Sequence, residues 1–233
     1  MTVIDLHSHI IPIDHGCQSI DDSHAQLELM SAAGTEIAVA TPHFYPHVHK
    51  IDGFIKKRDL AIEEIASDAP KSAPRLCLGA EVLLCEGMED MAELDKLCIR
   101  GTKVLLVELP MHTLKDGHID TVEALMQNGY TVLLAHIDRY FDICEDDVKT
   151  LLSIGAQAQI NADALFHRQT LKKLRKYLEF TDSISALGSD IHGSSQKTYL
   201  HFTKAPKALK EHYGEIMRRS KSLLRHAEII SLN

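Results

Sequence analysis

The chain has 233 residues, 45% of them hydrophobic, and a formal net charge of -8. This length allows one large domain, and the acidic balance argues against nucleic acid as a bulk partner, because phosphate backbones favour basic surfaces. No apolar run approaches the roughly 18 residues of a membrane-spanning helix, and no signal-like segment opens the chain. Five cysteines without a C-x-x-C pair fit reduced thiols. These features predict a cytoplasmic protein that is not integral to a membrane.

Short apolar runs with strand-like composition alternate with segments of helical periodicity. The strand-like runs span residues 2–7, 36–43, 75–81, 103–110, 131–137, 156–161 and 183–190. The helical segments span residues 23–33, 52–66, 121–129, 146–155 and 169–180. Gly34, Gly129 and Gly155 stand where helix C-caps are expected. The alternation predicts a parallel β/α architecture, and the absence of a Gly-, Ser- or Pro-rich linker favours a single domain over residues 1–233.

Nearly every strand-like run carries a His, Asp or Glu at its carboxyl end. His7 and His9 lie at the end of the first run, and they share a face because side chains alternate along a strand. The later runs end with His43, Glu81, Glu108, His136, Asn161, Asp190 and His192. In a barrel such residues surround one mouth, so the pattern favours a barrel over an open sheet. No glycine-rich nucleotide-binding motif follows any of the runs.

Imidazole and carboxylate ligands without cysteine suit zinc, manganese or iron(II). The candidate ligands are too many for one ion, which implies two or three ions bridged by carboxylates. Ions in such an arrangement activate water for hydrolysis, most often of phosphate esters. A cysteine-based phosphatase is excluded, because no cysteine is followed by arginine six positions later. A barrel amidohydrolase would need a strand-borne lysine or further histidines, and a non-enzymatic metal-binding scaffold fits an intact ligand set poorly.

The motifs DLHSH, TPH, GAE, VELP, AHIDRY and GSDIH occur in an order that resembles the polymerase and histidinol phosphatase (PHP) superfamily. Over residues 4 to about 197 the chain is most similar to the bacterial metal-dependent protein-tyrosine phosphatases of capsule and exopolysaccharide loci. The resemblance implies a distorted (β/α)7 TIM-like barrel that holds up to three Mn²⁺ ions, with iron or zinc as substitutes. It also implies a phosphotyrosine protein substrate, the tyrosine-rich tail of a capsule-assembly tyrosine kinase. The alternative is a small-molecule phosphatase, such as a histidinol-phosphate phosphatase.

The resemblance also implies a ligand set for each of three ions. The first ion would be held by His7, His9, Glu81 and Asp190. Glu81 would bridge to a second ion on Glu108 and His136. A third ion would lie on His43, His192 and a loop residue before Gly16. That loop reads Asp14-His15-Gly16 instead of the expected Asp-Asp-Gly, so His15 aligns with the usual carboxylate and Asp14 is the alternative.

Arg139, in AHIDRY, resembles the arginine with which this family clamps phosphate. A guanidinium fork matches two phosphate oxygens, whereas the alternative for Arg139 is a surface salt bridge to Asp142. A second arginine is expected shortly after SDIH, but the chain has Lys197 there, which supplies charge without bidentate geometry. The sequence allows an oligomer and does not specify one.

Overall fold

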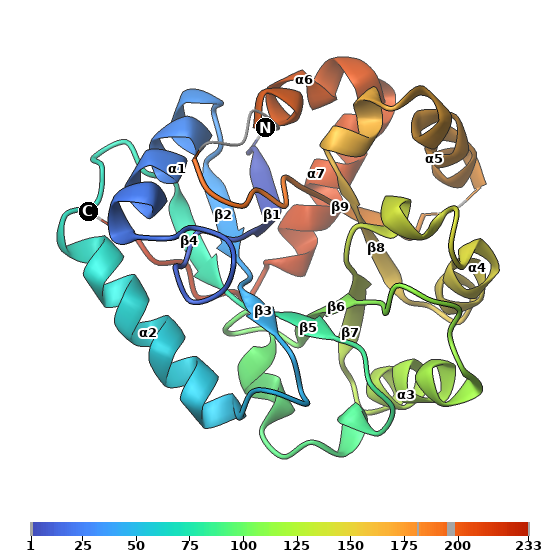
Figure 1. The fold of residues 1–233 in the computed structure, drawn as a ribbon. Coiled ribbons are helices and arrows are strands. Elements are labelled where there is room, and N and C mark those ends of the chain that lie inside the picture. Colours follow the sequence, from blue (N-terminus) through green and yellow to red (C-terminus); the bar gives the residue numbers. More distant parts are fainter. Residues whose placement is uncertain (1, 181, 195–198, 233) are drawn as a thin grey trace.

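The computed structural model describes residues 2–180, 182–194 and 199–232, and two parallel sheets form its centre (Figure 1). The strands are β1 (Ile4–Ser8), β2 (Ile37–Ala40), β3 (His43–Phe44), β4 (Arg75–Leu78), β5 (Glu81–Leu83), β6 (Val104–Glu108), β7 (Thr131–Leu134), β8 (Gln157–Asn161) and β9 (Ile184–Gly188). The first sheet has the order β1-β2-β4, and the second has the order β3-β5-β6-β7-β8-β9. Every pairing within these sheets is parallel, so the predicted parallel β/α architecture is confirmed.

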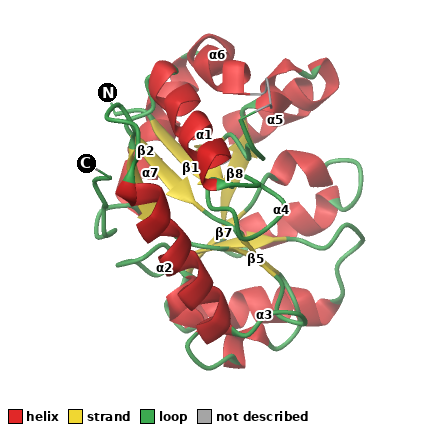
Figure 2. Cartoon of the chain, turned by 60° about the vertical axis from the view of Figure 1, so that its left-hand side comes forward, coloured by secondary structure: helices red, strands yellow, loops and turns green. Residues whose placement is uncertain are grey.

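The helices lie around the outside of the strands in both views (Figures 1 and 2). The α-helices are α1 (Ile20–Ala32), α2 (Ile51–Ser67), α3 (Asp116–Gln127), α4 (Glu145–Ser153), α5 (Arg168–Phe180), α6 (Tyr199–Leu209) and α7 (Glu211–Leu223). Short 3₁₀ helices are η1 (Met88–Asp90), η2 (Leu94–Leu97), η3 (Ile137–Tyr140) and η4 (Asp163–Phe166). In the described part of the chain, no helix has both the length and the apolar character needed to cross a bilayer.

Helix ends follow the expected local chemistry. The Ser19 side chain accepts a hydrogen bond from the backbone of Asp22 and so caps α1 at its N-terminus. Gly34, Gly129 and Gly155 follow α1, α3 and α4 with φ values of 83°, 86° and 113°. Only glycine adopts this left-handed region at little cost, so the predicted helix ends are confirmed.

Two of the predicted strands are each divided by a break. The second predicted strand gives β2 and β3, which flank Pro42, and proline has no N–H to continue a ladder. The third gives β4 and β5, which flank Gly79. The breaks lie side by side, because Gly79 N donates to Ala40 O at 2.9 Å and Glu81 N donates to Pro42 O at 3.1 Å. Hydrogen bonds therefore continue from the first sheet to the second across the breaks.

The remaining edges of the two sheets, β1 and β9, also lie next to each other. Asp190 N donates to His7 O at 2.8 Å, and His9 N donates to Ile191 O at 3.1 Å. Both bonds lie at the carboxyl ends of the strands. They bring residues 7–9 next to residues 190–192, although the two segments are separated by most of the chain.

Candidate metal centre

The predicted strand-end residues meet at the carboxyl ends of the strands. Six of the nine predicted ligands are buried: His7, His9, His43, Glu81, His136 and Asp190. Glu108 and His192 are partly buried, and His15 is exposed. Charged and imidazole side chains are seldom fully buried unless they are paired or bind metal, so this cluster requires a functional explanation.

Four ligand atoms from β1, β5 and the end of β9 point at one position. His7 Nε2 lies 3.2 Å from both His9 Nε2 and Glu81 Oε2. It lies 3.5 Å from Asp190 Oδ1. His9 Nε2 lies 3.3 Å from Glu81 Oε2 and 3.2 Å from Asp190 Oδ1. These are five of the six edges of a tetrahedron, and a regular tetrahedron with edges of this length has its centre about 2.0 Å from each corner, which is a metal–ligand distance for Zn²⁺ and similar ions.

The two carboxylate oxygens of this group lie within 3.5 Å of imidazole nitrogens, but those nitrogens do not donate a hydrogen bond to them. Among the described residues, no donor reaches Glu81 Oε2 or Asp190 Oδ1 in hydrogen-bonding geometry. The other oxygens are occupied, because Glu81 Oε1 lies 2.8 Å from His136 Nε2 and Asp190 Oδ2 accepts from Asn161 Nδ2 at 3.0 Å. Buried carboxylate oxygens without a donor are costly, and a cation would satisfy both. The four residues therefore fit a divalent metal ion.

The buried charges hold one another ionised. Burial alone would raise the pKa of Glu81, but His7 and His136 hold that pKa well below its usual range. Burial would also raise the pKa of Asp190, and His7 and His9 leave it well below its ordinary value. Burial would lower the pKa of His7, yet the carboxylates of Glu81 and Asp190 leave it raised. Each of these side chains therefore favours the charged form of its neighbours, and metal binding, which requires an unprotonated nitrogen, would release protons.

An additional carboxylate orients His9. Asp14 Oδ2 lies 2.8 Å from His9 Nδ1 and also accepts from His43 N at 2.8 Å, while Asp14 Oδ1 accepts from Gly16 N at 2.8 Å. A Cβ at Gly16 would lie 2.4 Å from His9 Cβ, so the loop closes on His9 only with glycine there. Both Asp14 oxygens are therefore engaged in holding the loop and the imidazole. This arrangement favours an orienting role for Asp14 over direct metal ligation.

Two further groups of potential ligands share members with the first. One comprises His43, Glu81 and Glu108, and the other comprises His9, His43 and His192. His43 Nδ1 lies 3.0 Å from Glu81 Oε2 and 3.7 Å from Glu108 Oε2. Burial lowers the pKa of His43 to about 3 and that of His192 to about 4, which keeps both rings neutral as metal ligands require. Because Glu81 belongs to two groups, it is placed to bridge two ions.

Some predicted ligands lie beside these groups without joining them. His136 Nε2 is 3.8 Å from Glu108 Oε1, and its ring stacks on His7 with a centroid distance of 5.5 Å. His15 stacks on His43 and His192 with centroid distances of 4.5 Å and 4.7 Å. His15 thus lies next to the third group, where the sequence predicts it to bind metal. The assignment of His15 as a ligand stays a prediction.

Replacing His15 with alanine is expected to remove the third ion only. The loop Asp14-His15-Gly16 would keep its hydrogen bonds, because these come from Asp14 and the backbone. Inductively coupled plasma analysis after gel filtration should show about one ion fewer per chain. His47→Ala, which removes an exposed histidine from a neighbouring loop, is the matched control. Unchanged metal content in His15→Ala would mean that His15 is not a ligand.

The backbone is strained at two predicted ligands. His136 has φ 30° and Asp190 has φ 51°, in the left-handed region that residues other than glycine rarely adopt. Such conformations cost about 1–3 kcal/mol each and persist where the surrounding structure enforces them. They cluster at functional sites, and here both lie where a strand of the second sheet ends.

Arg139, on η3, reaches the metal centre from its edge. Its Nη2 pairs with Asp190 Oδ2, while 43% of the Arg139 side chain stays exposed. The alternative partner, Asp142, instead accepts a hydrogen bond from Lys173 Nζ at 2.6 Å. Burial would lower the pKa of Arg139, but Asp190 raises it, so the guanidinium stays charged. Lys197, the other predicted phosphate contact, lies outside the described residues.

The sequence-based prediction missed Gln159 as a part of the site. Gln159 is fully buried on β8, and its Oε1 accepts from His136 N at 2.7 Å and lies 3.1 Å from His7 Nδ1. Asn161, which was recognised only as a strand end, donates to Asp190. The signal was present in the segment AQAQIN, because amide side chains at alternate positions of a strand share one face.

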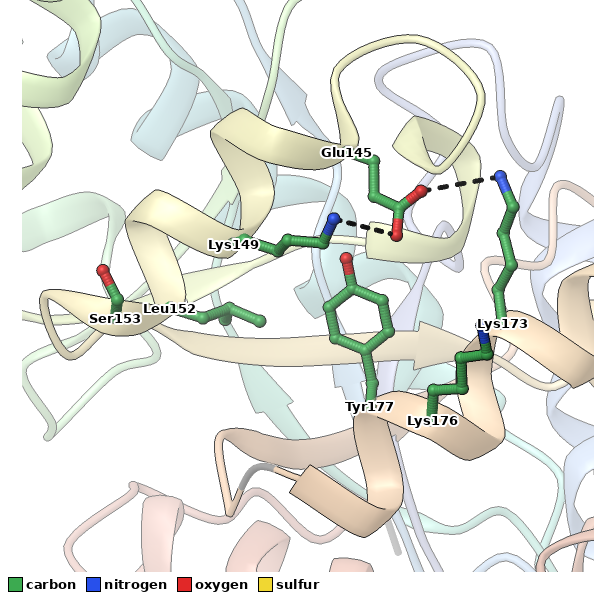
Figure 3. A pocket seen from close by; sticks show the side chains of 7 residues that line it. All are labelled: Glu145, Lys149, Leu152, Ser153, Lys173, Lys176 and Tyr177. Carbon is green, nitrogen blue, oxygen red and sulfur yellow. Dashed lines mark ion pairs between the residues drawn. The ribbon is translucent and has the colours of Figure 1, made fainter.

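A separate cavity of about 570 Å³ lies between α4 and α5 (Figure 3). Glu145 lies 3.3 Å from Lys149 Nζ and 3.7 Å from Lys173 Nζ, so one carboxylate is shared by a lysine from each helix. The ring of Tyr177 and the side chain of Leu152 contribute apolar surface. None of the nine predicted ligands lines this cavity. It therefore lacks the groups that metal-dependent hydrolysis requires.

Comparisons with known proteins agree with this geometry. Tyrosine-protein phosphatase CpsB from Streptococcus pneumoniae is 27% identical over 211 residues, which cover 82% of this chain and 83% of the relative. Tyrosine-protein phosphatase YwqE from Bacillus subtilis (strain 168) is 27% identical over 225 residues, which cover 91% of this chain and 85% of the relative. These relatives confirm the resemblance that the motifs from DLHSH to GSDIH indicate.

The fold is also that of a solved relative. A chain from the crystal structures of YwqE from Bacillus subtilis and CpsB from Streptococcus pneumoniae, metal-dependent tyrosine phosphatases, superimposes with a TM-score of 0.80. It is 22% identical, and the superposition covers 98% of this chain and 96% of the solved chain. The family model for capsular polysaccharide synthesis, CpsB/CapC, matches residues 3–230. This protein belongs to the CpsB/CapC family.

Proposed function

We propose that this protein is a metal-dependent phosphatase that hydrolyses phosphotyrosine in a protein substrate. The observation that carries the proposal is the convergence of His7 Nε2, His9 Nε2, Glu81 Oε2 and Asp190 Oδ1 on one position, with the Arg139 guanidinium at its edge. Metal ions and an arginine together neutralise the charge that develops on phosphoryl oxygens. The names of the CpsB and YwqE relatives, both tyrosine-protein phosphatases, support phosphotyrosine as the substrate class.

The proposed ligand set follows the strand ends. One ion would be held by His7, His9, Glu81 and Asp190; a second by Glu81, Glu108 and His136; and a third by His15, His43 and His192. We propose Mn²⁺ as the physiological ion, with iron or zinc as substitutes, because the donors are imidazoles and carboxylates without thiolate. When bound, the ions supply Lewis acidity and lower the pKa of a coordinated water toward neutrality.

In this proposal, side chains of the protein orient the phosphate, and the leaving group needs little protonation. Arg139 uses Nη2 on Asp190, and its guanidinium has five N–H donors in a fixed plane. We propose that the remaining donors bind two phosphoryl oxygens and that Lys197 contributes positive charge. A tyrosine phenol has a pKa of about 10, so its phenolate departs without a strong general acid.

We further propose that the two sheets form one distorted (β/α)7 TIM-like barrel of the PHP type. The hydrogen bonds between β1 and β9, and those across the breaks near Pro42 and Gly79, support continuity around the ring. Residues 1–233 would then be a single phosphatase domain. We place the protein in the cytoplasm, where the tyrosine-rich tail of a capsule-assembly kinase would be its substrate.

Metal removal is expected to abolish the activity. Dialysis against a chelator, followed by removal of the chelator, should leave no detectable hydrolysis of a phosphotyrosyl peptide, and Mn²⁺ should restore it. The physical reason is that the proposed mechanism relies on bound ions to lower the pKa of the attacking water. Circular dichroism of the stripped protein provides the control for folding. Full activity at verified zero metal content would contradict the mechanism.

The substrate class can be tested on the same preparation. Release of inorganic phosphate from a phosphotyrosyl peptide is compared with release from histidinol phosphate at equal Mn²⁺. A protein phosphatase is expected to favour the peptide in kcat/KM by at least about 10²-fold, which corresponds to about 2.7 kcal/mol of transition-state binding. Preference for histidinol phosphate would identify a small-molecule phosphatase instead.

A further inference from the structure

Two amide side chains on β8 connect three parts of the metal centre. Gln159 and Asn161 are two residues apart, so they face the same side of the strand, and both are buried. Gln159 Oε1 accepts from His136 N at 2.7 Å and lies 3.1 Å from His7 Nδ1. Gln159 Nε2 donates to Asn161 Oδ1 at 2.9 Å. Asn161 Nδ2 then donates to Asp190 Oδ2 at 3.0 Å. We call Gln159 and Asn161 the amide relay.

The groups at its two ends fix the direction of every bond in the amide relay. A backbone N–H can only donate, so the Gln159 atom that faces His136 N is the oxygen. At the other end Asn161 Nδ2 donates to Asp190 Oδ2, so the oxygen of the same amide faces Gln159. The bond between the two amides then has one direction. Because Gln159 Oε1 is an acceptor, the proton of a neutral His7 lies on Nδ1 and the lone pair lies on Nε2.

The neighbouring strand leaves room for Gln159. A Cβ at Gly188 of β9 would lie 2.6 Å from Gln159 Nε2 and 2.6 Å from His7 Cβ. Real Cβ atoms do not approach other atoms so closely, so only glycine allows the amide to pass between β9 and β1 at this point. The backbone of β9 is thus shaped around the Gln159 side chain, which is an observation independent of the hydrogen bonds.

We propose that Gln159 is a positioning residue that prepares His7 and Asp190 to bind metal. Its oxygen directs the His7 Nε2 lone pair toward the ion, and through Asn161 it holds Asp190 by Oδ2 so that Oδ1 faces the same position. Gln159 contacts neither substrate nor metal. The inference rests on the proposed function, because it requires an ion on His7 and Asp190. It predicts that loss of Gln159 lowers metal affinity directly and lowers turnover only because less metal is bound.

Metal affinity tests the proposal directly. Gln159→Leu keeps a similar side-chain volume but removes the amide. It therefore loses the contact with His7 and the hydrogen bond to Asn161. Loss of such hydrogen bonds to metal ligands costs about 10–100-fold in affinity, so Kd for Mn²⁺, measured by competition with a chelator, should rise by that factor. Gln157→Leu is the matched control, because Gln157 lies on the same strand and accepts from the Ser185 hydroxyl instead. Its Kd is expected to equal that of the wild type.

A spectroscopic measurement distinguishes the contact of Gln159 with His7 from the link through Asn161 to Asp190. In Zn²⁺-loaded protein, two-bond ¹H–¹⁵N correlation spectra identify which nitrogen of His7 carries the proton. The wild type should show a slowly exchanging proton on His7 Nδ1, and Gln159→Leu should exchange it faster. Asn161→Ala removes only the link between Gln159 and Asp190. It should raise Kd and leave the His7 signal unchanged.

The possible outcomes distinguish the amide relay from the proposed function. A wild-type Kd for Gln159→Leu would overturn the relay, and so would an equal loss in Gln157→Leu, which would indicate a general packing effect of β8. If Gln159→Leu does not fold, Gln159→Met replaces it, because its unbranched side chain fills a similar space without the amide, and the same rise in Kd is expected. If the wild-type protein binds no Mn²⁺ or Zn²⁺, the proposed function and the amide relay both fail, whereas a wild-type Kd for Gln159→Leu overturns the relay alone.

Discussion

Glu81→Ala is expected to abolish turnover. Glu81 belongs to two of the three potential ligand groups, and its Oε2 lies within 3.3 Å of nitrogens from His7, His9 and His43. Its removal would take a shared ligand from two of the proposed ions, and it would leave those imidazoles without the Glu81 carboxylate. We expect kcat/KM for a phosphotyrosyl peptide to fall by roughly 10³-fold or more, together with a loss of bound metal.

The control for this variant is Glu86→Ala, in the loop that follows the same strand. Glu86 is exposed, and its nearest cationic partner is Lys115 Nζ at 4.0 Å, so metal content and rate should stay at wild-type values. Thermal unfolding of the metal-free proteins would show whether Glu81→Ala still folds. A folded Glu81→Ala protein with full metal content and normal turnover would be incompatible with a bridging carboxylate.

Arg139→Ala is expected to lower kcat/KM by about 10²–10³-fold, or about 3–4 kcal/mol, which is typical for the loss of one preorganised charge partner of the transition state. Metal content should change little, because Asn161 still donates to the Asp190 oxygen that Arg139 contacts. Arg139→Lys should recover only part of the rate, because an ammonium cannot reproduce a two-pronged contact. Steady-state kinetics on one phosphotyrosyl peptide, with metal analysis of each protein, provide the measurement.

Arg175→Ala provides a matched loss of positive charge, because Arg175 is exposed on α5 and away from the predicted ligands. It should leave kcat/KM unchanged. A near-normal rate for Arg139→Ala would place Arg139 among surface residues. A parallel loss of metal and activity would instead show that its main role is to hold Asp190.

Much of the fold was predictable because polar or charged residues mark the end of each apolar run in the sequence. The apolar runs that end in His7, Glu108 and Asn161 became β1, β6 and β8 with small changes in their bounds. The breaks near Pro42 and Gly79 were not predicted, since an apolar run with a proline still has strand-like composition. The helix α6 was also missed, because no strand follows it to mark a β/α unit and because Pro206 lies in its interior.

The site was predictable to the extent that its chemistry appears in single residues. His, Asp and Glu residues at strand ends indicate a metal site. The structure brings together His7, His9, Glu81 and Asp190, which is the group that the sequence resemblance implies for the first ion. The supporting hydrogen bonds were not predictable. Asp14 and Gln159 act through side-chain oxygens whose partners lie up to 152 positions away, and one sequence contains no measure of that proximity.

The contact between the ends of β1 and β9 implies that metal binding would also affect stability. The first ligand group takes His7 and His9 from one sheet, Glu81 from the other, and Asp190 from the segment after β9. An ion bound there, as proposed, would cross-link segments that are separated by most of the chain, in addition to its part in catalysis. At a free concentration 100 times Kd, such a ligand adds about 2.7 kcal/mol to the free energy of unfolding. Metal supply would then set how long each molecule survives in the cell, in addition to how fast it works.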